Sequence, residues 1–341
     1  MSNSPDMPWL QKAWQTLQQR LDGGTLPHAL LVTAEAGVGK RSWADHAAHM
    51  LVCSQSPAPC GQCRQCRLVA GGSHPDIRTY GPENRSRVVR VSQIRELIGF
   101  AMTSPQVSRR KVAIIDRADQ LNPSAANALL KTLEEPPEDL VLILLQESGR
   151  PILPTIRSRC QVMTLPPPVG DQALGWLLET AVGLDQVDEA LCRTALRMAG
   201  GAPGLALEYL QTDLVAGRDR ALDHFRKYLK AQITVNQAAR PFRELGLEQA
   251  LRLLEGWAAD LARVGAGGMA YDTSAADVLD YLAGRNPAWR AHELLAAIRE
   301  SRAAMTNNVN ADLEIQRLLI GWQKLMPRRS AAKMAGQGAA H

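Results

Sequence analysis

Residues 29–42 read Ala-Leu-Leu-Val-Thr-Ala-Glu-Ala-Gly-Val-Gly-Lys-Arg-Ser, and this stretch decides the fold. The apolar residues 29–33 predict a strand, residues 34–40 a glycine-containing loop, and the residues towards Leu51 a helix. A strand, a glycine loop and a helix in this order are typical of a phosphate-binding loop, because glycine lets backbone N–H groups turn inward around an anion. The stretch predicts an α/β domain that descends from a nucleotide site. A glycine turn without any such role is the alternative.

The loop lacks two parts of the phosphate-binding pattern, which requires a glycine, four residues, and then Gly-Lys-Ser or Gly-Lys-Thr. Gly37, Gly39 and Lys40 are present. Ala34 stands at the first glycine, and Arg41 replaces the hydroxyl residue that holds Mg²⁺. The three matching residues are candidates for contact with ATP or ADP, and nucleotide binding stays open at this point.

The second half of the expected site is also damaged. Residues 111–116 predict a strand that ends in Asp116, the position of the acid that helps to hold Mg²⁺. Arg117 follows, where many ATPases place an acid that polarises the attacking water, and a permanently cationic arginine cannot act as that base. Because both halves are damaged, we predict that the chain does not hydrolyse ATP by itself. The alternative is an ATPase with a divergent loop, since Lys40 and Asp116 remain.

Four cysteines form a cluster directly after the predicted helix: Cys53, Cys60, Cys63 and Cys66, with the spacing C-x6-C-x2-C-x2-C. Four thiolates at this density suit a tetrahedral Zn²⁺ ion. Since the protein would fill every coordination position, the metal would be structural and would staple a loop too short for a core of its own. An iron–sulfur cluster, a redox dithiol and unpaired cysteines are the alternatives.

The composition is that of an ordinary globular protein, with 45% hydrophobic and 21% charged residues. A net charge of +5 is compatible with a nucleic-acid partner without requiring one. The first residues show no basic region followed by an apolar run, and no uninterrupted apolar stretch reaches the ~18 residues of a membrane helix. We therefore expect a cytoplasmic protein without membrane contact.

Strands and helices alternate through residues 1–167, which predicts a parallel sheet with helices on both faces. The cysteine module at 53–66 interrupts this domain. Residues 168–209 predict a small helical domain and residues 210–328 an all-helical one. Residues 329–341 are small, polar or basic, and we expect them to be disordered.

Three segments together resemble one family. Residues 125–137 read Ala-Ala-Asn-Ala-Leu-Leu-Lys-Thr-Leu-Glu-Glu-Pro-Pro, and Ser158-Arg159-Cys160 follows about twenty residues after the double proline. With the cysteine insertion after the phosphate-loop helix, these segments resemble the bacterial members of the clamp-loader branch of the AAA+ ATPases. The resemblance is strong over about residues 25–165 and only architectural in the helical C-terminal region.

The resemblance implies a fold and a mechanism. The fold would be an AAA+ P-loop parallel sheet with a zinc-binding insertion, followed by a helical lid domain and an all-α collar domain for oligomer contact. Clamp loaders are five-subunit spirals with ATP sites at the subunit interfaces. Arg159 would then be an arginine finger that acts on the ATP of a neighbouring subunit, a role worth roughly 10³–10⁵ in rate in GTPases. An ordinary surface arginine is the alternative.

The damaged motifs favour a non-hydrolysing structural subunit of the bacterial DNA polymerase III clamp loader, because the tau/gamma ATPase subunits would keep both motifs intact. The implied partners are the tau/gamma and delta subunits in a hetero-pentamer, with primed DNA inside the assembly. The chain would support loading of the sliding clamp during DNA replication, without independent catalysis, as part of the polymerase holoenzyme. Gly204 matches the position at which working members carry an arginine, and Lys131 is either a contact for the DNA backbone or a solvated lysine.

Overall fold

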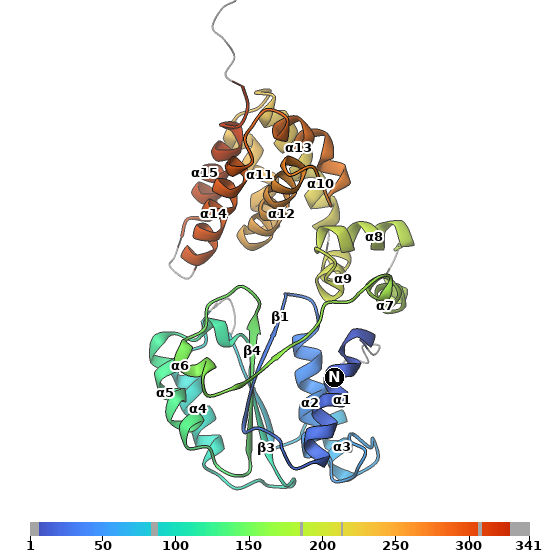
Figure 1. Cartoon of the computed structure of the whole chain (residues 1–341), viewed down its shortest axis with the longest axis vertical. Helices are drawn as coiled ribbons and strands as arrows, with labels where there is room; N and C mark the ends of the chain where they lie inside the picture. Colours follow the sequence, from blue (N-terminus) through green and yellow to red (C-terminus); the bar gives the residue numbers. More distant parts are fainter. Residues whose placement is uncertain (1–6, 83–87, 185–186, 213, 306–308, 328–341) are drawn as a thin grey trace, which may run out of the picture. The chain divides into compact units, whose positions relative to one another are not determined.

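The computed structural model describes residues 7–82, 88–184, 187–212, 214–305 and 309–327 (Figure 1). The chain divides into two compact units, residues 1–208 and 209–341. The tail predicted to be disordered, residues 329–341, lies outside the described residues. Among the helices of the described ranges, none has the length and apolar character needed to cross a bilayer.

The first unit contains one parallel sheet of five strands in the order β2-β3-β4-β1-β5. The strands are β1 (Ala29–Ala34), β2 (Ile77–Tyr80), β3 (Lys111–Ile115), β4 (Leu140–Glu147) and β5 (Gln161–Thr164). Every residue of β1, β3 and β4 is buried, as expected for central parallel strands that are covered on both faces. The predicted P-loop sheet is therefore confirmed.

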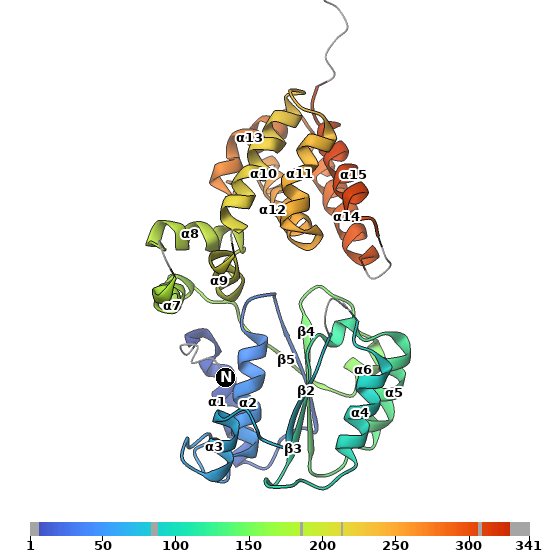
Figure 2. The same cartoon turned by 180° about the vertical axis from the view of Figure 1, so that it is seen from behind.

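Helices cover both faces of this sheet (Figures 1 and 2). One face carries α1 (Gln11–Asp22), α2 (Lys40–Val52) and α3 (Arg64–Ala70), and the other carries α4 (Val91–Ala101), α5 (Pro123–Glu134) and α6 (Pro154–Arg157). Leu31, Ala113 and Leu142 point into the core formed with α4, α5 and α6. On each of these strands, the residues directly before and after point to the opposite face of the sheet, because side chains alternate along a strand.

The helix α5 shows how the local sequence fixes an element that matters below. The side chain of Asn122 accepts a hydrogen bond of 2.8 Å from the backbone N–H of Ala125, and Pro123 occupies the first helical turn. The helix ends at Glu134, and after one further residue comes a double proline that cannot continue it. Glu134 and Glu135 therefore lie at a fixed C-terminal end of the helix.

In the described residues after β5, helices are the regular secondary structure. After the sheet come α7 (Gln172–Thr180), α8 (Glu189–Met198) and α9 (Pro203–Gln211), then α10 (Leu214–Leu229), α11 (Val235–Leu245), α12 (Leu247–Gly265), α13 (Ala276–Ala283), α14 (Trp289–Ala304) and α15 (Ala311–Gln323). Short 3-10 turns are η1 (Pro8–Leu10), η2 (Ala118–Gln120), η3 (Ala181–Gly183) and η4 (Thr273–Ala275). The second unit packs around aromatic rings: the centroid of Phe225 lies 4.9 Å from that of Trp257 and 5.2 Å from that of Trp322.

Candidate functional site

The phosphate loop lies between β1 and α2, as the sequence predicts. Gly37 and Gly39 have φ angles of 75° and 110°, which are left-handed backbone conformations that favour glycine. Lys40 begins α2, and its Nζ donates hydrogen bonds to the backbone carbonyl oxygens of Ala34 and Glu35 at 2.9 and 2.7 Å. The lysine that would contact phosphates is therefore bonded to carbonyls of its own loop.

The start of α9 lies directly against this loop. The backbone N–H of Gly204 donates a hydrogen bond of 2.9 Å to the carbonyl oxygen of Gly37. A Cβ atom added to Gly37 would lie 2.5 Å from the backbone nitrogen of Leu205, and one added to Gly204 would lie 2.8 Å from the carbonyl oxygen of Gly37. Gly204, predicted as the place of a missing arginine, is thus also a point where two backbones touch.

The N-terminal segment covers the loop as well. A Cβ atom added to Gly39 would lie 2.4 Å from the sulfur of Met7. The indole Nε1 of Trp9 donates a hydrogen bond of 2.8 Å to the carbonyl oxygen of Val38, and its ring meets that of Trp176 edge to face with centroids 5.9 Å apart. Sequence reasoning missed this cover, because no local pattern indicates that Met7 and Trp9 reach a loop thirty residues further along the chain.

Asp116, the acid predicted to help hold Mg²⁺, forms an ion pair with an arginine of the same chain. Arg41 Nη1 lies 3.7 Å from Asp116 Oδ2, and Arg41 Nε donates to Asp45 Oδ1 at 2.9 Å. The guanidinium also donates to Thr79 Oγ1 at 3.3 Å. The residue that replaces the hydroxyl ligand therefore places a positive charge beside the acid that would otherwise face a metal ion.

Arg117 belongs to a network of two arginines and two acids. Its backbone has a φ of 65°, and its Nη2 lies 3.1 Å from Asp119 Oδ2 and 3.3 Å from Glu147 Oε2. Arg150 Nε lies 3.7 Å and 3.3 Å from oxygens of the same two acids. The Asp119 side chain is fully buried, so its charge needs these partners. No motif in the sequence singled out Asp119, Glu147 or Arg150 as members of the site.

The charges of this network extend to the phosphate loop. Burial lowers the pKa of the Lys40 ammonium, and the carboxylate of Glu147 opposes this change only in part. Arg117 adds to the lowering, since its positive charge disfavours a second cation nearby. Lys40, Arg117 and Glu147 therefore form one electrostatic group at this end of the sheet.

Arg159 follows α6 and keeps about a third of its side chain exposed, 34%. Its Nη2 donates to Glu134 Oε1 at 2.5 Å. Its Nη1 donates to the carbonyl oxygen of Thr155 at 3.0 Å and lies 3.4 Å from Ser158 Oγ. The guanidinium is thus held at both terminal nitrogens, a restraint on the predicted finger that the sequence did not indicate.

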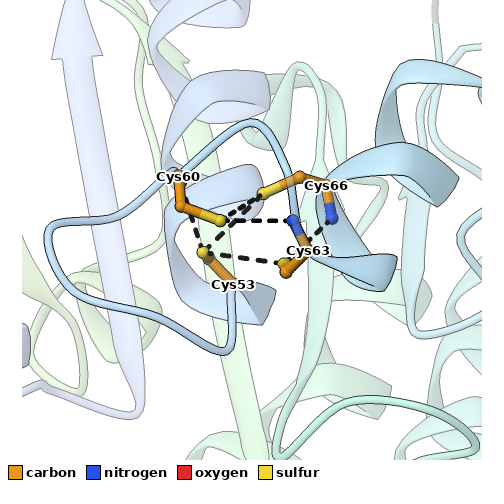
Figure 3. Close-up of side chains that lie close together, drawn as sticks. All are labelled: Cys53, Cys60, Cys63 and Cys66. Atoms are coloured by element: carbon orange, nitrogen blue, oxygen red, sulfur yellow. Dashed lines mark hydrogen bonds between the residues drawn. The ribbon is translucent and has the colours of Figure 1, made fainter.

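The four predicted metal ligands come together at one point (Figure 3). Their sulfur atoms all lie within 4.8 Å of one another, with separations of 3.9 Å for Cys53 and Cys63, 3.8 Å for Cys60 and Cys66, and 3.7 Å for Cys66 and Cys53. A tetrahedron of sulfurs about 2.3 Å from zinc has edges of about 3.8 Å, so these spacings fit a Zn²⁺ ion. They are too long for disulfide bonds.

Backbone N–H groups also point at the sulfurs. Cys60 donates to the sulfur of Cys53 at 3.4 Å, Cys63 to that of Cys60 at 3.3 Å, and Cys66 to that of Cys63 at 3.4 Å. Burial raises the pKa of the Cys63 thiol, but hydrogen bonds from Ser54 and Cys66 outweigh burial and lower the pKa to about 5. Cys63 also caps the start of α3, so the ligand set and the helix form together.

A buried polar network connects this cysteine module to the edge of the sheet. His74 Nε2 and Gln65 Oε1 lie 3.0 Å apart, and Gln65 Nε2 donates to the carbonyl oxygen of Val107. The Asp76 carboxylate accepts hydrogen bonds from the backbone N–H groups of Val107 and Ser108 at 2.9 and 2.8 Å. Gln65 lies between Cys63 and Cys66 in the sequence, so the order of the cysteine cluster and the order of the loop before β3 depend on each other.

Comparisons with known proteins agree with these features. A family described as "DNA polymerase III, delta subunit" matches residues 9–169. The DNA polymerase III subunit delta prime of Pseudomonas aeruginosa is 32% identical over 325 residues, which cover 93% of this chain and 97% of that protein. This chain belongs to the delta prime family of DNA polymerase III subunits.

Other relatives match a shorter part of this delta prime family member. The delta prime subunit of Escherichia coli K12 is 36% identical over 208 residues, which cover 60% of this chain and 61% of that protein. The gamma/tau subunit of Mycobacterium tuberculosis H37Rv is 34% identical over 215 residues, 62% of this chain and 37% of that protein. The alignment with a solved gamma subunit-related protein from Thermotoga maritima covers 92% of this chain and 99% of that protein, at 16% identity and with a TM-score of 0.41.

Proposed function

We propose that this delta prime family member is a non-hydrolysing structural subunit of the DNA polymerase III clamp loader, and that it supports loading of the sliding clamp on primed DNA. The proposed lack of ATP hydrolysis rests on one observation: ion pairs within this chain fill the catalytic end of its ATP site. Arg117 stands where a catalytic acid would be and pairs with Glu147 at 3.3 Å. Arg41 faces Asp116 at 3.7 Å.

The phosphate loop of this chain holds no nucleotide in the proposed role. Gly37 is covered by Leu205 and Gly39 by Met7, each so closely that even a Cβ atom would collide. The Lys40 ammonium uses two of its three N–H donors on carbonyl oxygens of the loop. A nucleotide would have to displace these contacts before it met any phosphate-binding N–H group.

Arg159 is proposed to act on ATP bound by a neighbouring subunit. An arginine finger must reach the surface with a free face, and Arg159 is part-exposed on a short helix–strand connection. Its planar guanidinium can give two parallel hydrogen bonds to a phosphate and offset the charge that develops during transfer. This chain would then contribute to catalysis without a working site of its own.

The remaining parts are proposed to serve the assembly. The cysteine cluster would hold a structural Zn²⁺, which has no open position for chemistry because four sulfurs surround it. Residues 168–209 would form the lid and 210–328 the collar that contacts the tau/gamma and delta subunits in a hetero-pentamer. Lys131 is exposed on α5 and would lie towards DNA within that assembly.

The experiment is reconstitution of the clamp loader with variants of this chain. To isolate one site, the ATPase subunits carry substitutions of their own finger arginines, so that only the site completed by this chain is active. Arg159→Ala should then lower the rate of ATP hydrolysis about 10³-fold. Arg157→Ala, at the exposed last residue of α6 and two positions before Arg159, is the matched control and should leave the rate unchanged. An unchanged rate in Arg159→Ala would remove the finger from the proposal.

A further inference from the structure

Glu134 and Arg159 join two segments that lie 25 residues apart in the sequence. Glu134 is the last residue of α5, and Arg159 follows α6, the short helix that precedes β5. Glu134 Oε1 accepts a short hydrogen bond of 2.5 Å from Arg159 Nη2, and the opposite charges of the two groups make this bond charge-assisted. The pair therefore links the fixed end of a long helix to the proposed finger.

The other bonds of Arg159 come from α6 and its C-terminal cap, the residues directly before it in the sequence. Nη1 donates to the carbonyl oxygen of Thr155 at 3.0 Å and lies 3.4 Å from Ser158 Oγ. Contacts of this local kind follow the short helix wherever it moves, whereas Glu134 ties the guanidinium to α5. An arginine has five N–H donors, so these three contacts leave N–H groups for a phosphate oxygen.

We propose that Glu134 is a positioning residue for Arg159: it holds the guanidinium in one orientation before the neighbouring subunit binds. This inference rests on the proposed role of Arg159 as a finger. A free arginine side chain has many rotamers, and this rotamer entropy would otherwise be lost when the finger meets ATP. Glu134 removes part of that loss in advance, and its 49% exposure leaves the pair weak enough to adjust to a phosphate.

The first test uses the reconstituted assembly in which only the site completed by this chain is active. Glu134→Gln keeps the shape of the side chain but removes its charge, and it should lower kcat for ATP roughly threefold to tenfold. The KM for ATP should stay constant, because the finger acts in the transition state. Glu134→Asp restores the charge and should recover part of the rate.

The matched control is Glu135→Gln. Glu135 is the exposed neighbour of Glu134 at the same helix end, so its substitution changes the net charge by the same amount. Its kcat should equal that of the unsubstituted chain. A loss of rate in Glu135→Gln as large as that in Glu134→Gln would overturn the inference, because a general charge effect would then explain both.

A double substitution separates a positioning role from an independent one. In an assembly that already carries Arg159→Ala, the further change Glu134→Gln should have no effect on kcat, since Glu134 acts through Arg159. An additive loss would overturn the inference. If Arg159→Ala itself has no effect on kcat, the proposed finger is wrong and the inference loses its basis. If Arg159→Ala lowers kcat as expected but Glu134→Gln does not, the finger stands and the positioning role of Glu134 is overturned.

The isolated chain gives a readout that does not depend on activity. In nitrogen-15 NMR spectra, the guanidinium of Arg159 should show restricted rotation, with its signals assigned by their loss in Arg159→Lys. In Glu134→Gln these signals should shift and average, while in Glu135→Gln they should stay in place. Unchanged Arg159 signals in Glu134→Gln would show that the carboxylate does not hold the guanidinium.

Discussion

The backbone N–H of Gly204, at the start of α9, donates a hydrogen bond of 2.9 Å to the carbonyl oxygen of Gly37 in the phosphate loop. In this position a side chain has no room on either residue. The start of α9 therefore meets the loop at two glycines, where backbone lies directly against backbone. The same contact occupies space beside the glycines that a nucleotide phosphate would need.

Gly204→Ala should destabilise the first unit. The new Cβ would lie 2.8 Å from the Gly37 carbonyl oxygen, and a backbone atom cannot move away as cheaply as a flexible side chain. We expect the free energy of unfolding to fall by about 1–3 kcal/mol in urea titrations. Gly175→Ala in α7 is the control, because an added Cβ meets nothing within 4 Å there. Equal stability of the two variants would mean that the tight contact is not present in solution.

The purified chain should neither hydrolyse nor bind ATP. Its ATPase rate should stay at background with and without primed DNA, and Lys40→Ala should not change it, because Lys40 already bonds to Ala34 and Glu35. Millimolar Mg-ATP should not raise the melting temperature, since a ligand stabilises only a fold that binds it. A measurable rate that disappears in Lys40→Ala would favour the alternative of an ATPase with a divergent loop.

The cysteine cluster should hold one Zn²⁺ per chain. Protein purified without chelator should contain about one equivalent by elemental analysis, and Cys60→Ser should contain less than half an equivalent. Cys160→Ser serves as the control, because Cys160 lies outside the cluster and should keep the full metal content. Zinc removal should also expose the segment around Gln65 to proteolysis. A full-length chain without metal but equally resistant would exclude a structural role for zinc.

Asp76 should stabilise the fold in a pH-dependent way. Burial raises the pKa of its carboxyl group, but hydrogen bonds from the backbone of Gln106, Val107 and Ser108 outweigh burial and hold the pKa below its usual 3.8. The contribution is therefore complete above the unfolded pKa and is lost as the pH falls through the lower folded pKa. Asp76→Asn should cost about 2 kcal/mol of unfolding free energy at pH 7.

The difference between Asp76→Asn and the unsubstituted chain should shrink in strong acid, where both side chains are neutral. Urea titrations from pH 7 downward would measure it. Asp139→Asn, on a part-exposed residue directly before β4, should show a smaller cost at pH 7. A cost for Asp76→Asn that does not change with pH would mean that charge has no part in holding the loop.

Arg117→Ala should be costly even though it removes no expected catalytic group. It would leave the buried Asp119 and the nearly buried Glu147 with Arg150 as the remaining arginine of the network. Loss of one partner from a buried ion pair costs about 3–5 kcal/mol of unfolding free energy. Arg109→Ala, an exposed arginine, should stay within about 0.5 kcal/mol in the same urea titrations. A silent Arg117→Ala would mean that the network adds nothing to stability.

The sequence allowed correct prediction of those features whose signal is local. The strand before Gly37, the helix after Lys40 and the cysteine cluster each depend on residues within a short window, so spacing was enough. Strand β2 was missed, since the four residues Ile77–Tyr80 at the edge of the sheet are only partly buried and show little apolar pattern. The lid and collar boundaries and the role of Arg159 stay predictions.

The contacts that define the site could not be predicted, because they join distant segments. Trp9 reaches the loop at Val38, and Glu134 reaches Arg159 across 25 residues. The sequence showed that Arg117 stands where many ATPases place a catalytic acid, but nothing near it indicated its partner Glu147. Propensity and spacing describe what a segment forms, while such pairings depend on how segments pack.

The network of Arg117, Arg150, Asp119 and Glu147 has a consequence for the cell. Because the arginines and acids of this site neutralise one another, the stability of the site should not depend on the magnesium concentration or on the ATP-to-ADP ratio. Its shape should be the same in growing and in starved cells, whereas subunits that bind nucleotide change with supply. In the proposed clamp-loader assembly, one member of constant shape would provide a fixed reference against which the others could move.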